Sequence, residues 1–369
     1  MAVVKADAYG HGMLPSVRAA LAGGASWLGV VQLSDALALR AAGITAPVLS
    51  LHGSPGAAHA EAILGGIDLT AGTPELVAQI ARAADLAGRP ARVHLEADTG
   101  MSRGGAIAAD WPGLVAAAGA AEAAGLITVT GLWSHLACAD IPGHPSIPGQ
   151  LEAFKAAVAL AERAGLRPEV RHLANGPATV ALPDSHFDLV RPGGAVFGLS
   201  TLPGGAPGWL RPAMTVQARL IQVKRVPAGT PVSYAHRYVT PAETTLGVLP
   251  LGYNEGVPRH ATNQPGLLFS GGRRIAIAGT VNLNHIIVDL GSGPAAEGDI
   301  VVLFGPGDQG EATAQEWAGA LNTISYEIVT RFTGKVPRTY SGVTGGAHSG
   351  EAAAQAADGR SDGEVAAAL

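Results

Sequence analysis

The stretch Ala2-Val3-Val4-Lys5-Ala6-Asp7-Ala8-Tyr9-Gly10-His11-Gly12 is the part of the sequence around which the rest is organised. Three apolar residues lead directly to Lys5, and small residues and glycines follow, which is typical of a buried strand that ends in a loop. Desolvation at such a strand end lowers the pKa of a lysine, and a neutral amine is a nucleophile that can form a Schiff base. The alternative is a solvated lysine near the N-terminus.

The composition is that of a globular protein. Its 369 residues suffice for one large domain and a smaller one. With 47% hydrophobic residues, 14% charged residues and a net charge of -5, the sequence offers no basic surface for nucleic acid. The single cysteine, Cys138, excludes an internal disulfide and a cysteine-based zinc site, and we expect no metal. No signal peptide precedes the first strand and no apolar run could span a bilayer, so we expect a cytoplasmic protein without a membrane partner.

Short apolar runs alternate with alanine-rich helical segments over the first two hundred residues. This alternation predicts a (β/α)8 TIM barrel over residues 1–210. The competing fold is a doubly wound open sheet, but that fold usually has a glycine fingerprint directly after its first strand, where Lys-Ala-Asp-Ala-Tyr stands here. Ser34 is a plausible N-cap of one of the helices. The eight expected strands are Ala2–Ala6, Trp27–Val31, Pro47–Leu51, Asp68–Ala71, Arg92–Ala97, Ile127–Leu136, Val170–Ala174 and Asp188–Val190.

The pattern changes after residue 210. Short strand-like runs such as Thr244–Val248, Ile275–Ala278 and Ile286–Leu290 are separated by glycines, which predicts a β-rich domain over residues 211–341. Residues 342–369 are mainly Gly, Ala, Ser and Asp, and we expect a disordered tail without function.

Polar residues follow five of the expected barrel strands. They are Lys5, Arg103, His135, Asn175 and Arg191. Taken singly, His135 could be a core histidine, Asn175 a helix cap and Arg191 an ion-pair partner. Barrel enzymes carry their chemistry at the carboxyl ends of the strands, so the set as a whole favours an active site there.

Three motifs resemble those of one enzyme family, the alanine racemases. The run Val3-Val4-Lys5-Ala6-Asp7-Ala8-Tyr9-Gly10-His11-Gly12 resembles the family's cofactor-lysine motif, and Leu249-Pro-Leu-Gly252-Tyr253-Asn254-Glu255-Gly256 resembles the segment of its catalytic tyrosine. Ser325-Tyr326-Glu327-Ile328 resembles the segment whose tyrosine holds the cofactor phosphate. The resemblance extends in order from residue 2 to about residue 340.

This resemblance implies a pyridoxal 5'-phosphate (PLP) enzyme that interconverts L- and D-alanine, supplies D-alanine for peptidoglycan and acts as a homodimer with shared active sites. Lys5 and the partner's counterpart of Tyr253 would be the two bases, Lys5 for the D-enantiomer and tyrosine for the L-enantiomer. Arg103 and Leu283 would bind the substrate. The residues expected to bind the cofactor are Lys5, Tyr9, His135, Asn175, Gly176, Arg191, Gly193, Gly194 and Tyr326.

The chemistry accounts for these residue types. PLP needs a lysine, donors for its phosphate and a partner for its pyridine nitrogen. The Gly193-Gly194 pair can offer bare backbone N–H groups to a phosphate, although a double glycine is equally a turn. Arg191 stays protonated, so a pyridine nitrogen facing it must accept a hydrogen bond, which weakens the ring as an electron sink. Simple reprotonation is then favoured over decarboxylation or transamination.

The sequence departs from the family at four places. Only four residues precede Lys5, where the family usually has a few tens. Glu96 stands where many members have a carboxylated lysine, and Gly176 replaces a serine that usually helps to bind phosphate. Val281-Asn282-Leu283-Asn284-His285 stands where the family has Val-Cys-Met-Asp-Gln, so Asn284 removes a charge near the catalytic tyrosine.

Two other functions stay open. The altered segment 283–285 is compatible with a racemase of broader or different amino-acid specificity. A PLP-binding barrel protein without racemase activity is the other alternative. The second domain with Tyr253 and Tyr326 argues against it, because single-domain binders of that type lack both residues.

Overall fold

The computed structural model describes residues 1–342 and 366–368, and the chain divides into two compact units. We call Met1–Val196 with Ser200–Ala206 the barrel unit, and Phe197–Leu199 with Pro207–Leu369 the β unit. The tail expected over 342–369 lies outside the described residues, apart from residue 342 and the short strand β17 (Ala366–Ala368).

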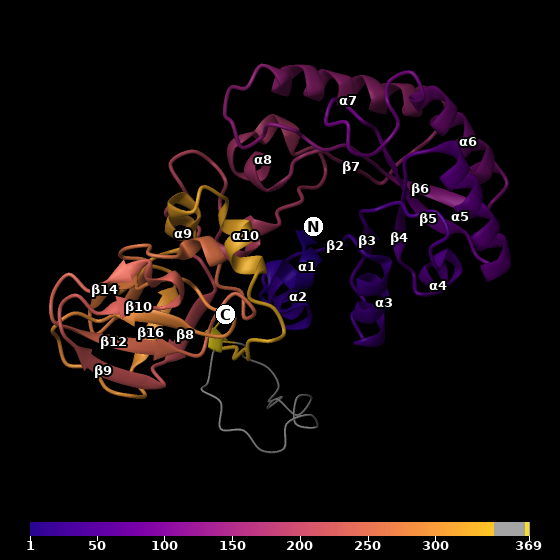
Figure 1. The fold of residues 1–369 in the computed structure, drawn as a ribbon. Coiled ribbons are helices and arrows are strands. Elements are labelled where there is room, and N and C mark those ends of the chain that lie inside the picture. The colour runs from indigo at the N-terminus through magenta and orange to yellow at the C-terminus, as the bar shows by residue number, and fades with distance from the viewer. Residues whose placement is uncertain (343–365, 369) are drawn as a thin grey trace. The chain divides into compact units, whose positions relative to one another are not determined.

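The barrel unit contains a seven-stranded sheet in which every strand is parallel to its neighbours, in the order β1 to β7. The strands follow one another around an arc, with α4 to α7 on its outer side (Figure 1). The strands are β1 (Ala2–Val3), β2 (Leu28–Val30), β3 (Val48–Ser50), β4 (Asp68–Ala71), β5 (Ala91–Glu96), β6 (Ile127–Trp133) and β7 (Val170–His172). The helices are α1 (Lys5–Tyr9), α2 (Met13–Ala22), α3 (Leu33–Ala41), α4 (His59–Leu64), α5 (Pro74–Ala87), α6 (Trp111–Ala123), α7 (Ser146–Arg163) and α8 (Gly176–Ala181), with 3₁₀ turns at Pro183–Ser185 and Gly194–Phe197.

The expected eighth strand, Asp188–Val190, is not a regular strand. Its segment still closes the ring, because the N–H of Asp188 donates to the Arg171 carbonyl at 3.0 Å and the N–H of Val3 donates to the Pro192 carbonyl at 2.9 Å. A regular ladder cannot form, since the Asp188 carboxylate takes the N–H of Arg171 at 2.8 Å, Phe187 has a φ of 48° and Pro192 has no N–H.

The chain makes a left-handed turn directly after Lys5. The strand β1 ends at Val3, earlier than expected, and the four residues Ala6 to Tyr9 have φ values between 52° and 54°. Each such residue with a Cβ is strained by about 1–2 kcal/mol. The turn is held by the Asp7 carboxylate, which accepts the N–H of Met13 at 2.8 Å, and by backbone bonds within the turn.

The two ends of the helix α5 are capped by a threonine side chain and a glycine. Thr73 caps α5 by accepting the N–H of Leu76 at 3.2 Å, and Gly88 ends that helix in a left-handed conformation. The prediction for Ser34 is wrong. The helix α3 already includes Leu33, and Gln32 is its N-cap, so Ser34 lies inside the first turn.

The β unit has an antiparallel sheet in the order β17-β8-β16-β13-β14-β15-β12-β9 and a small hairpin of β10 and β11. The α9 helix begins with a capping box between Thr313 and Glu316, and the buried Trp317 donates its indole N–H to the carbonyls of Leu267 and Leu303. The elements are β8 (Thr215–Arg219), β9 (Gln222–Val226), β10 (Pro231–Val232), β11 (Tyr238–Val239), β12 (Thr244–Leu249), β13 (Leu268–Ser270), β14 (Arg273–Ile277), β15 (Ile286–Asp289), β16 (Ile300–Phe304), α9 (Ala314–Ala320) and α10 (Ser325–Thr330), with 3₁₀ turns at Tyr234–His236 and Arg259–Ala261.

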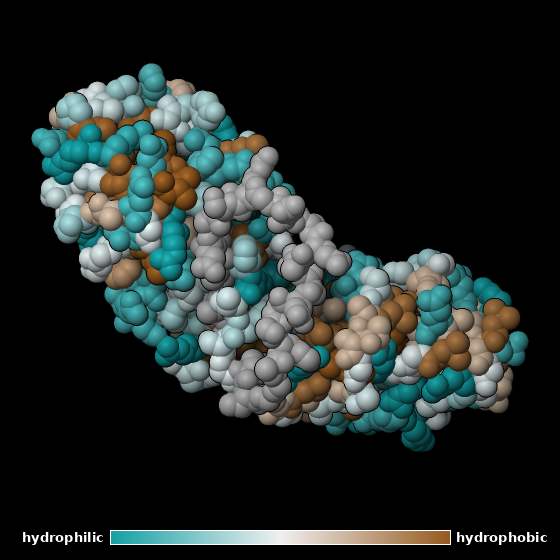
Figure 2. All heavy atoms as spheres, turned by 90° about the horizontal axis from the view of Figure 1, so that it is seen from below, coloured by the Kyte–Doolittle hydropathy of each residue, from teal (hydrophilic) through white to brown (hydrophobic). Residues whose placement is uncertain are grey.

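The surface is mixed. Figure 2 shows hydrophobic residues scattered among hydrophilic ones on the face that it presents. Among the described residues, no helix has both the length and the apolar character needed to cross a membrane.

The left-handed turn gives a stability prediction. We expect Ala6→Gly to raise the free energy of unfolding by up to about 1 kcal/mol, because glycine adopts positive φ without steric strain. Ala19→Gly, at an exposed position in the right-handed helix α2, is the matched control and should lower it by about 1 kcal/mol. Urea unfolding of both variants measures the difference. Equal losses of stability would contradict a strained turn.

Candidate active site

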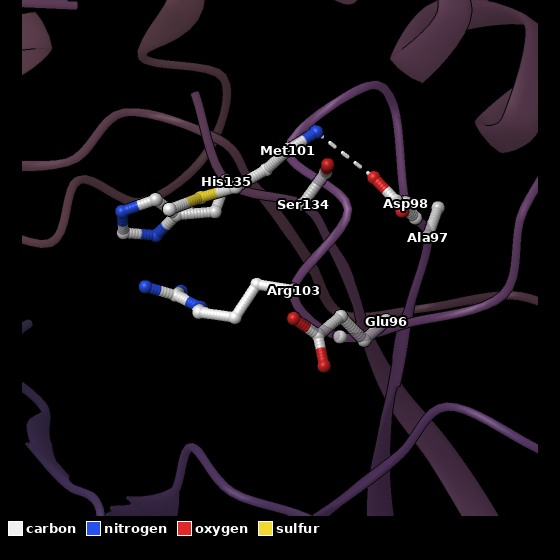
Figure 3. A pocket seen from close by; sticks show the side chains of 8 residues that line it. Glu96, Ala97, Asp98, Met101, Arg103, Ser134 and His135 are labelled. Atoms are coloured by element: carbon white, nitrogen blue, oxygen red, sulfur yellow. Dashed lines mark hydrogen bonds between the residues drawn. The ribbon is translucent and has the colours of Figure 1, made fainter. Parts of the chain in front are cut away.

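The barrel unit brings one group of the expected site residues together beyond the carboxyl ends of its strands. Part of the group lines a pocket formed by Glu96, Ala97, Asp98, Met101, Arg103, Gly104, Ser134 and His135. Figure 3 shows the Arg103 guanidinium on the side of the His135 ring, and the Glu96 carboxyl near the other end of the Arg103 side chain. Hydrogen bonds and charge interactions connect this pocket to Lys5, Asn175 and Arg191.

Lys5 has the environment of a reactive amine. Burial lowers the pKa of Lys5, and the positive charges of Arg103 and Arg191 lower it further. Its Nζ lies 6.0 Å from the centre of the Tyr9 ring. A larger fraction of Lys5 is therefore neutral than for a solvated lysine, as predicted from the sequence for a nucleophile.

Arg103 is carried by a tightly shaped loop that follows β5. One oxygen of Asp98 accepts the N–H groups of Gly100, Met101 and Ser102 at 2.9 to 3.1 Å. The loop then returns to the strand end, where the N–H of Ala106 donates to the Glu96 carbonyl at 2.9 Å. These bonds fix the backbone on both sides of Arg103, whose own side chain is exposed.

His135 and Asn175 are linked. The Asn175 side-chain oxygen caps α8 by accepting the N–H of Ala178, and its amide nitrogen lies 3.2 Å from the Leu136 carbonyl and 3.3 Å from His135 Nε2. Burial, Arg191, Arg103 and Lys5 lower the pKa of His135 to about 2, so its ring is neutral. Asn175 is therefore both a helix cap and a support for the His135 loop.

Arg191 is buried, and its guanidinium is held mainly by backbone carbonyls. It donates to the carbonyls of His172 at 2.9 Å, Ser134 at 2.7 Å and Leu173 at 3.1 Å. Its guanidinium carbon lies 4.9 Å from the centre of the Trp133 ring. Burial lowers the pKa of Arg191 to about 9, so the group is still a cation at neutral pH.

A chain of buried side chains supports Arg191. Arg191 Nη1 lies 3.0 Å from His172 Nδ1, His172 Nε2 lies 2.9 Å from His94 Nδ1, and His94 Nε2 lies 3.2 Å from the Asp68 carboxylate. Arginine only donates, and His172 is neutral because burial lowers its pKa well below the ordinary value. His172 Nδ1 must therefore accept, its Nε2 donates to His94, and His94 donates to Asp68.

These hydrogen-bonded side chains were not predicted from the sequence as part of the site. The signal was present, because Asp68, His94 and His172 are polar residues inside runs expected to be buried strands. Gly131 makes room for the chain, since a Cβ at this position would overlap the His94 ring.

Gln150 is a second supporting residue that was not predicted from the sequence. It is buried on α7, accepts the N–H of Ala137 at 3.0 Å and donates to the His135 carbonyl at 3.2 Å.

Glu96 is a largely buried carboxyl beside these basic groups. Burial raises the pKa of Glu96 to about 7, although Arg103 and Arg191 act in the opposite direction. A Cβ added to Gly104 would lie 3.1 Å from a Glu96 carboxylate oxygen, so the Arg103 loop passes directly over this side chain.

Tyr9 and Gly193 form a close approach that fits a phosphate group. A Cβ at Gly193 would overlap the Tyr9 hydroxyl, so only glycine lets the backbone come this near. Gly194 begins a 3₁₀ turn, and Gly176 is buried at the first position of α8. The Tyr9 hydroxyl and the backbone N–H groups of these glycines can donate to a phosphate. Together with the half-buried amine of Lys5 and the cation Arg191, they suit an anionic cofactor that carries an aldehyde and a ring nitrogen.

Three other expected site residues, Tyr253, Leu283 and Tyr326, lie in the β unit. Tyr253 and Leu283 are on neighbouring loops, because the N–H of Tyr253 donates to the Asn282 carbonyl at 3.0 Å. Both side chains are exposed, by 43% and 52%. Tyr326 is on α10.

The buried chain predicts a large effect of His172→Phe. The change removes the ring that accepts from Arg191 Nη1 and donates to His94 Nδ1, and it breaks the buried chain, so we expect the free energy of unfolding to fall by about 3 kcal/mol. His52→Phe, at an exposed position, should change it by less than about 0.5 kcal/mol. Chemical denaturation of both variants measures this, and similar small effects would contradict the chain.

Glu96 predicts a pH dependence of stability. Its pKa is raised from 4.5 to about 7, so the folded state holds this proton more tightly and its contribution to stability is lost as pH rises through that window. Glu96→Gln removes the titration. We expect the variant to gain stability relative to the parent between about pH 5 and pH 7.5 in urea unfolding. Glu61→Gln, at an exposed position, is the control, and parallel profiles of Glu96→Gln and the parent would contradict the assignment.

Comparison with known proteins agrees with this geometry. Residues 1–201 match the family model "Alanine racemase, N-terminal domain", and residues 213–340 match "Alanine racemase, C-terminal domain". The alanine racemase of Frankia casuarinae is 57% identical over 343 residues, covering 92% of this chain and 89% of its own length. That of Thermobifida fusca is 56% identical, covering 93% and 91%.

Solved structures give the same result. The crystal structure of alanine racemase from the D-cycloserine producing Streptomyces lavendulae superposes with a TM-score of 0.91 at 50% identity, covering 93% of this chain and 90% of that one. The structure from Streptomyces coelicolor gives a TM-score of 0.90 at 52% identity, covering 92% and 91%. The chain therefore belongs to the alanine racemase family, whose members depend on PLP.

Proposed function

We propose that this protein is an alanine racemase that uses PLP to interconvert L-alanine and D-alanine. The observation that carries the proposal is the environment of Lys5, a half-buried amine whose pKa is lowered by burial and by two arginines. Family membership over both units supports it. The product D-alanine would serve peptidoglycan synthesis, and we propose the cytoplasm as its location.

The barrel unit would hold the cofactor. Lys5 would bind it through its amine, Tyr9 and the backbone of Gly193 and Gly194 would bind its phosphate, and Arg191 would donate to its ring nitrogen. The remaining cofactor residues would be His135, Asn175 and Gly176 in the barrel unit and Tyr326 in the β unit. Bound PLP supplies the electron withdrawal that acidifies the α-hydrogen of an amino acid.

Two groups of the chain would move the proton. Lys5, with its lowered pKa, would take the α-proton of D-alanine on one face. Tyr253 would take the α-proton of L-alanine on the opposite face, and its exposed side chain suits a residue that serves the site of a second subunit. We therefore propose a homodimer with shared active sites, in which Tyr253 acts opposite the partner's lysine.

The substrate carboxylate would be bound by Arg103 and by the backbone of Leu283. The loop of Arg103 is shaped by Asp98, so the cation is presented at a fixed place. The segment after Leu283 carries Asn284 and His285, which motivates the alternative of a racemase with a broader or different amino-acid substrate. A barrel protein that binds PLP without racemising anything is the remaining alternative.

The proposal is tested by following the L-to-D exchange of alanine by circular dichroism, with and without added PLP, beside serine and lysine. We expect turnover of alanine, and its absence would refute the proposal. Turnover of serine or lysine above that of alanine would favour the alternative specificity.

The role of Tyr253 has a separate test. Tyr253→Phe should lower kcat by at least about a hundredfold, the usual contribution of a general acid–base group, while the absorbance of bound PLP persists. Tyr234→Phe, at another exposed tyrosine of the β unit, is the control and should leave kcat unchanged. Undiminished racemisation by Tyr253→Phe would contradict the two-base assignment.

A further inference from the structure

The loop of Tyr253 and the loop of Leu283 are joined by their backbones. The N–H of Tyr253 donates to the Asn282 carbonyl at 3.0 Å, and the N–H of Asn254 donates to the Leu283 carbonyl at 2.9 Å. A Cβ at Gly252 would overlap the carbonyl oxygens of Asn282 and Leu283, so the two loops lie as close as glycine permits.

A second connection between these loops uses the side chains of Glu255 and Asn284. One oxygen of Glu255 accepts the amide of Asn284 at 2.7 Å and the amide of Asn254 at 2.8 Å. The other oxygen accepts the N–H of Gly252 at 2.8 Å. Lys335 then donates to the side-chain oxygen of Asn254 at 2.6 Å. The carboxylate therefore meets donors only, and every amide orientation in the cluster is determined.

We propose that Glu255 and Asn284 are positioning residues that fix Leu283 relative to Tyr253, so that substrate binding and proton transfer use one preassembled element of the β unit. We call this pair the Glu255–Asn284 clip. The inference rests on the proposed function, in which Leu283 contacts the substrate carboxylate and Tyr253 the α-proton. Both side chains are exposed, so they have few packing contacts of their own to fix them, and loop hydrogen bonds must do so.

The clip explains why this chain has asparagine at position 284, where the family resemblance leads us to expect aspartate. An aspartate at this position would put a second carboxylate at hydrogen-bond distance from Glu255, and two like charges would repel each other there. Asn284 supplies a donor instead. The identity of residue 284 is therefore tied to that of residue 255, and the substrate itself does not dictate it.

The test measures racemisation by the PLP-loaded full chain with Asn284→Asp, Glu255→Gln and the double variant. We expect Asn284→Asp to lower kcat/KM on the order of tenfold, because a charge-assisted hydrogen bond becomes a repulsion. In the double variant the introduced glutamine amide can donate to the introduced aspartate but no longer accepts from Asn254, so kcat/KM should recover part of the loss. Gln222→Glu, which adds a negative charge at an exposed position of β9, is the control and should change nothing.

Isotope effects distinguish positioning from general damage. Deuterium on the α-carbon of L-alanine reports proton removal by Tyr253, and deuterium on D-alanine reports removal by Lys5. In Asn284→Asp the isotope effect with L-alanine should rise and that with D-alanine should fall, while the absorbance of bound PLP is unchanged. Unaltered isotope effects, or additive losses in the double variant, would overturn the proposal.

A readout without catalysis separates this inference from the proposed function. The midpoints of thermal unfolding of the parent, the two single variants and the double variant form a cycle, and the clip predicts that they are not additive. If the parent fails to racemise alanine, the proposed function is refuted, and the cycle then decides alone whether the clip exists. Additive midpoints would overturn it.

Discussion

The site of the barrel unit gathers three basic groups, Lys5, Arg103 and Arg191, and the two arginines interact with the carboxyl of Glu96. Burial and the charges of Arg103 and Arg191 lower the pKa of Lys5, and burial with the same cations lowers the pKa of His135, so its ring is neutral. Glu96 cannot balance them fully, because burial raises its pKa to about 7. The pocket therefore carries an excess of positive charge that an anion would neutralise. A phosphate and a carboxylate, the two anionic groups of the proposed cofactor and substrate, meet this requirement.

In the buried hydrogen-bond chain from Arg191 to Asp68, the donor and the acceptor of each hydrogen bond are determined. A cation at one end and a carboxylate at the other leave one tautomer for His172 and one for His94. A group that faces Arg191 from the pocket meets a donor and must accept. The proposed consequence is that the ring nitrogen of the cofactor stays unprotonated, so electron withdrawal is moderate. Returning the proton to the α-carbon is then favoured over breaking other bonds.

Much of the fold could be predicted from local sequence. The alternation of apolar runs and alanine-rich segments located the seven strands of the barrel sheet, since their burial is visible in single stretches. The eighth segment has one of its neighbours, β1, at the far end of the sequence, and the Asp188 carboxylate takes the N–H of Arg171 in a way that no local pattern reveals. The left-handed turn at Ala6 to Tyr9 was hidden because alanine and tyrosine rarely adopt this conformation.

The site could be predicted only where motifs or strand ends marked it. Lys5, His135, Asn175 and Arg191 come together in the barrel unit as expected. The partners that hold them were not visible. His94 and His172 are 78 positions apart and meet only because β5 and β6 shift register beside Gly131. Whether a buried histidine has a partner depends on such packing, which a single sequence does not display.

The strained turn after Lys5 and the irregular eighth segment of the barrel are in direct contact. Val3, two residues before Lys5, donates to the Pro192 carbonyl, and Tyr9, at the end of the turn, fits against Gly193. The same short segment therefore closes the barrel and receives the residue expected to bind phosphate. Left-handed strain persists only where surrounding contacts determine the conformation, and Ala8 and Tyr9 of this turn are buried. Barrel closure thus places Lys5, which lies between these two contacts.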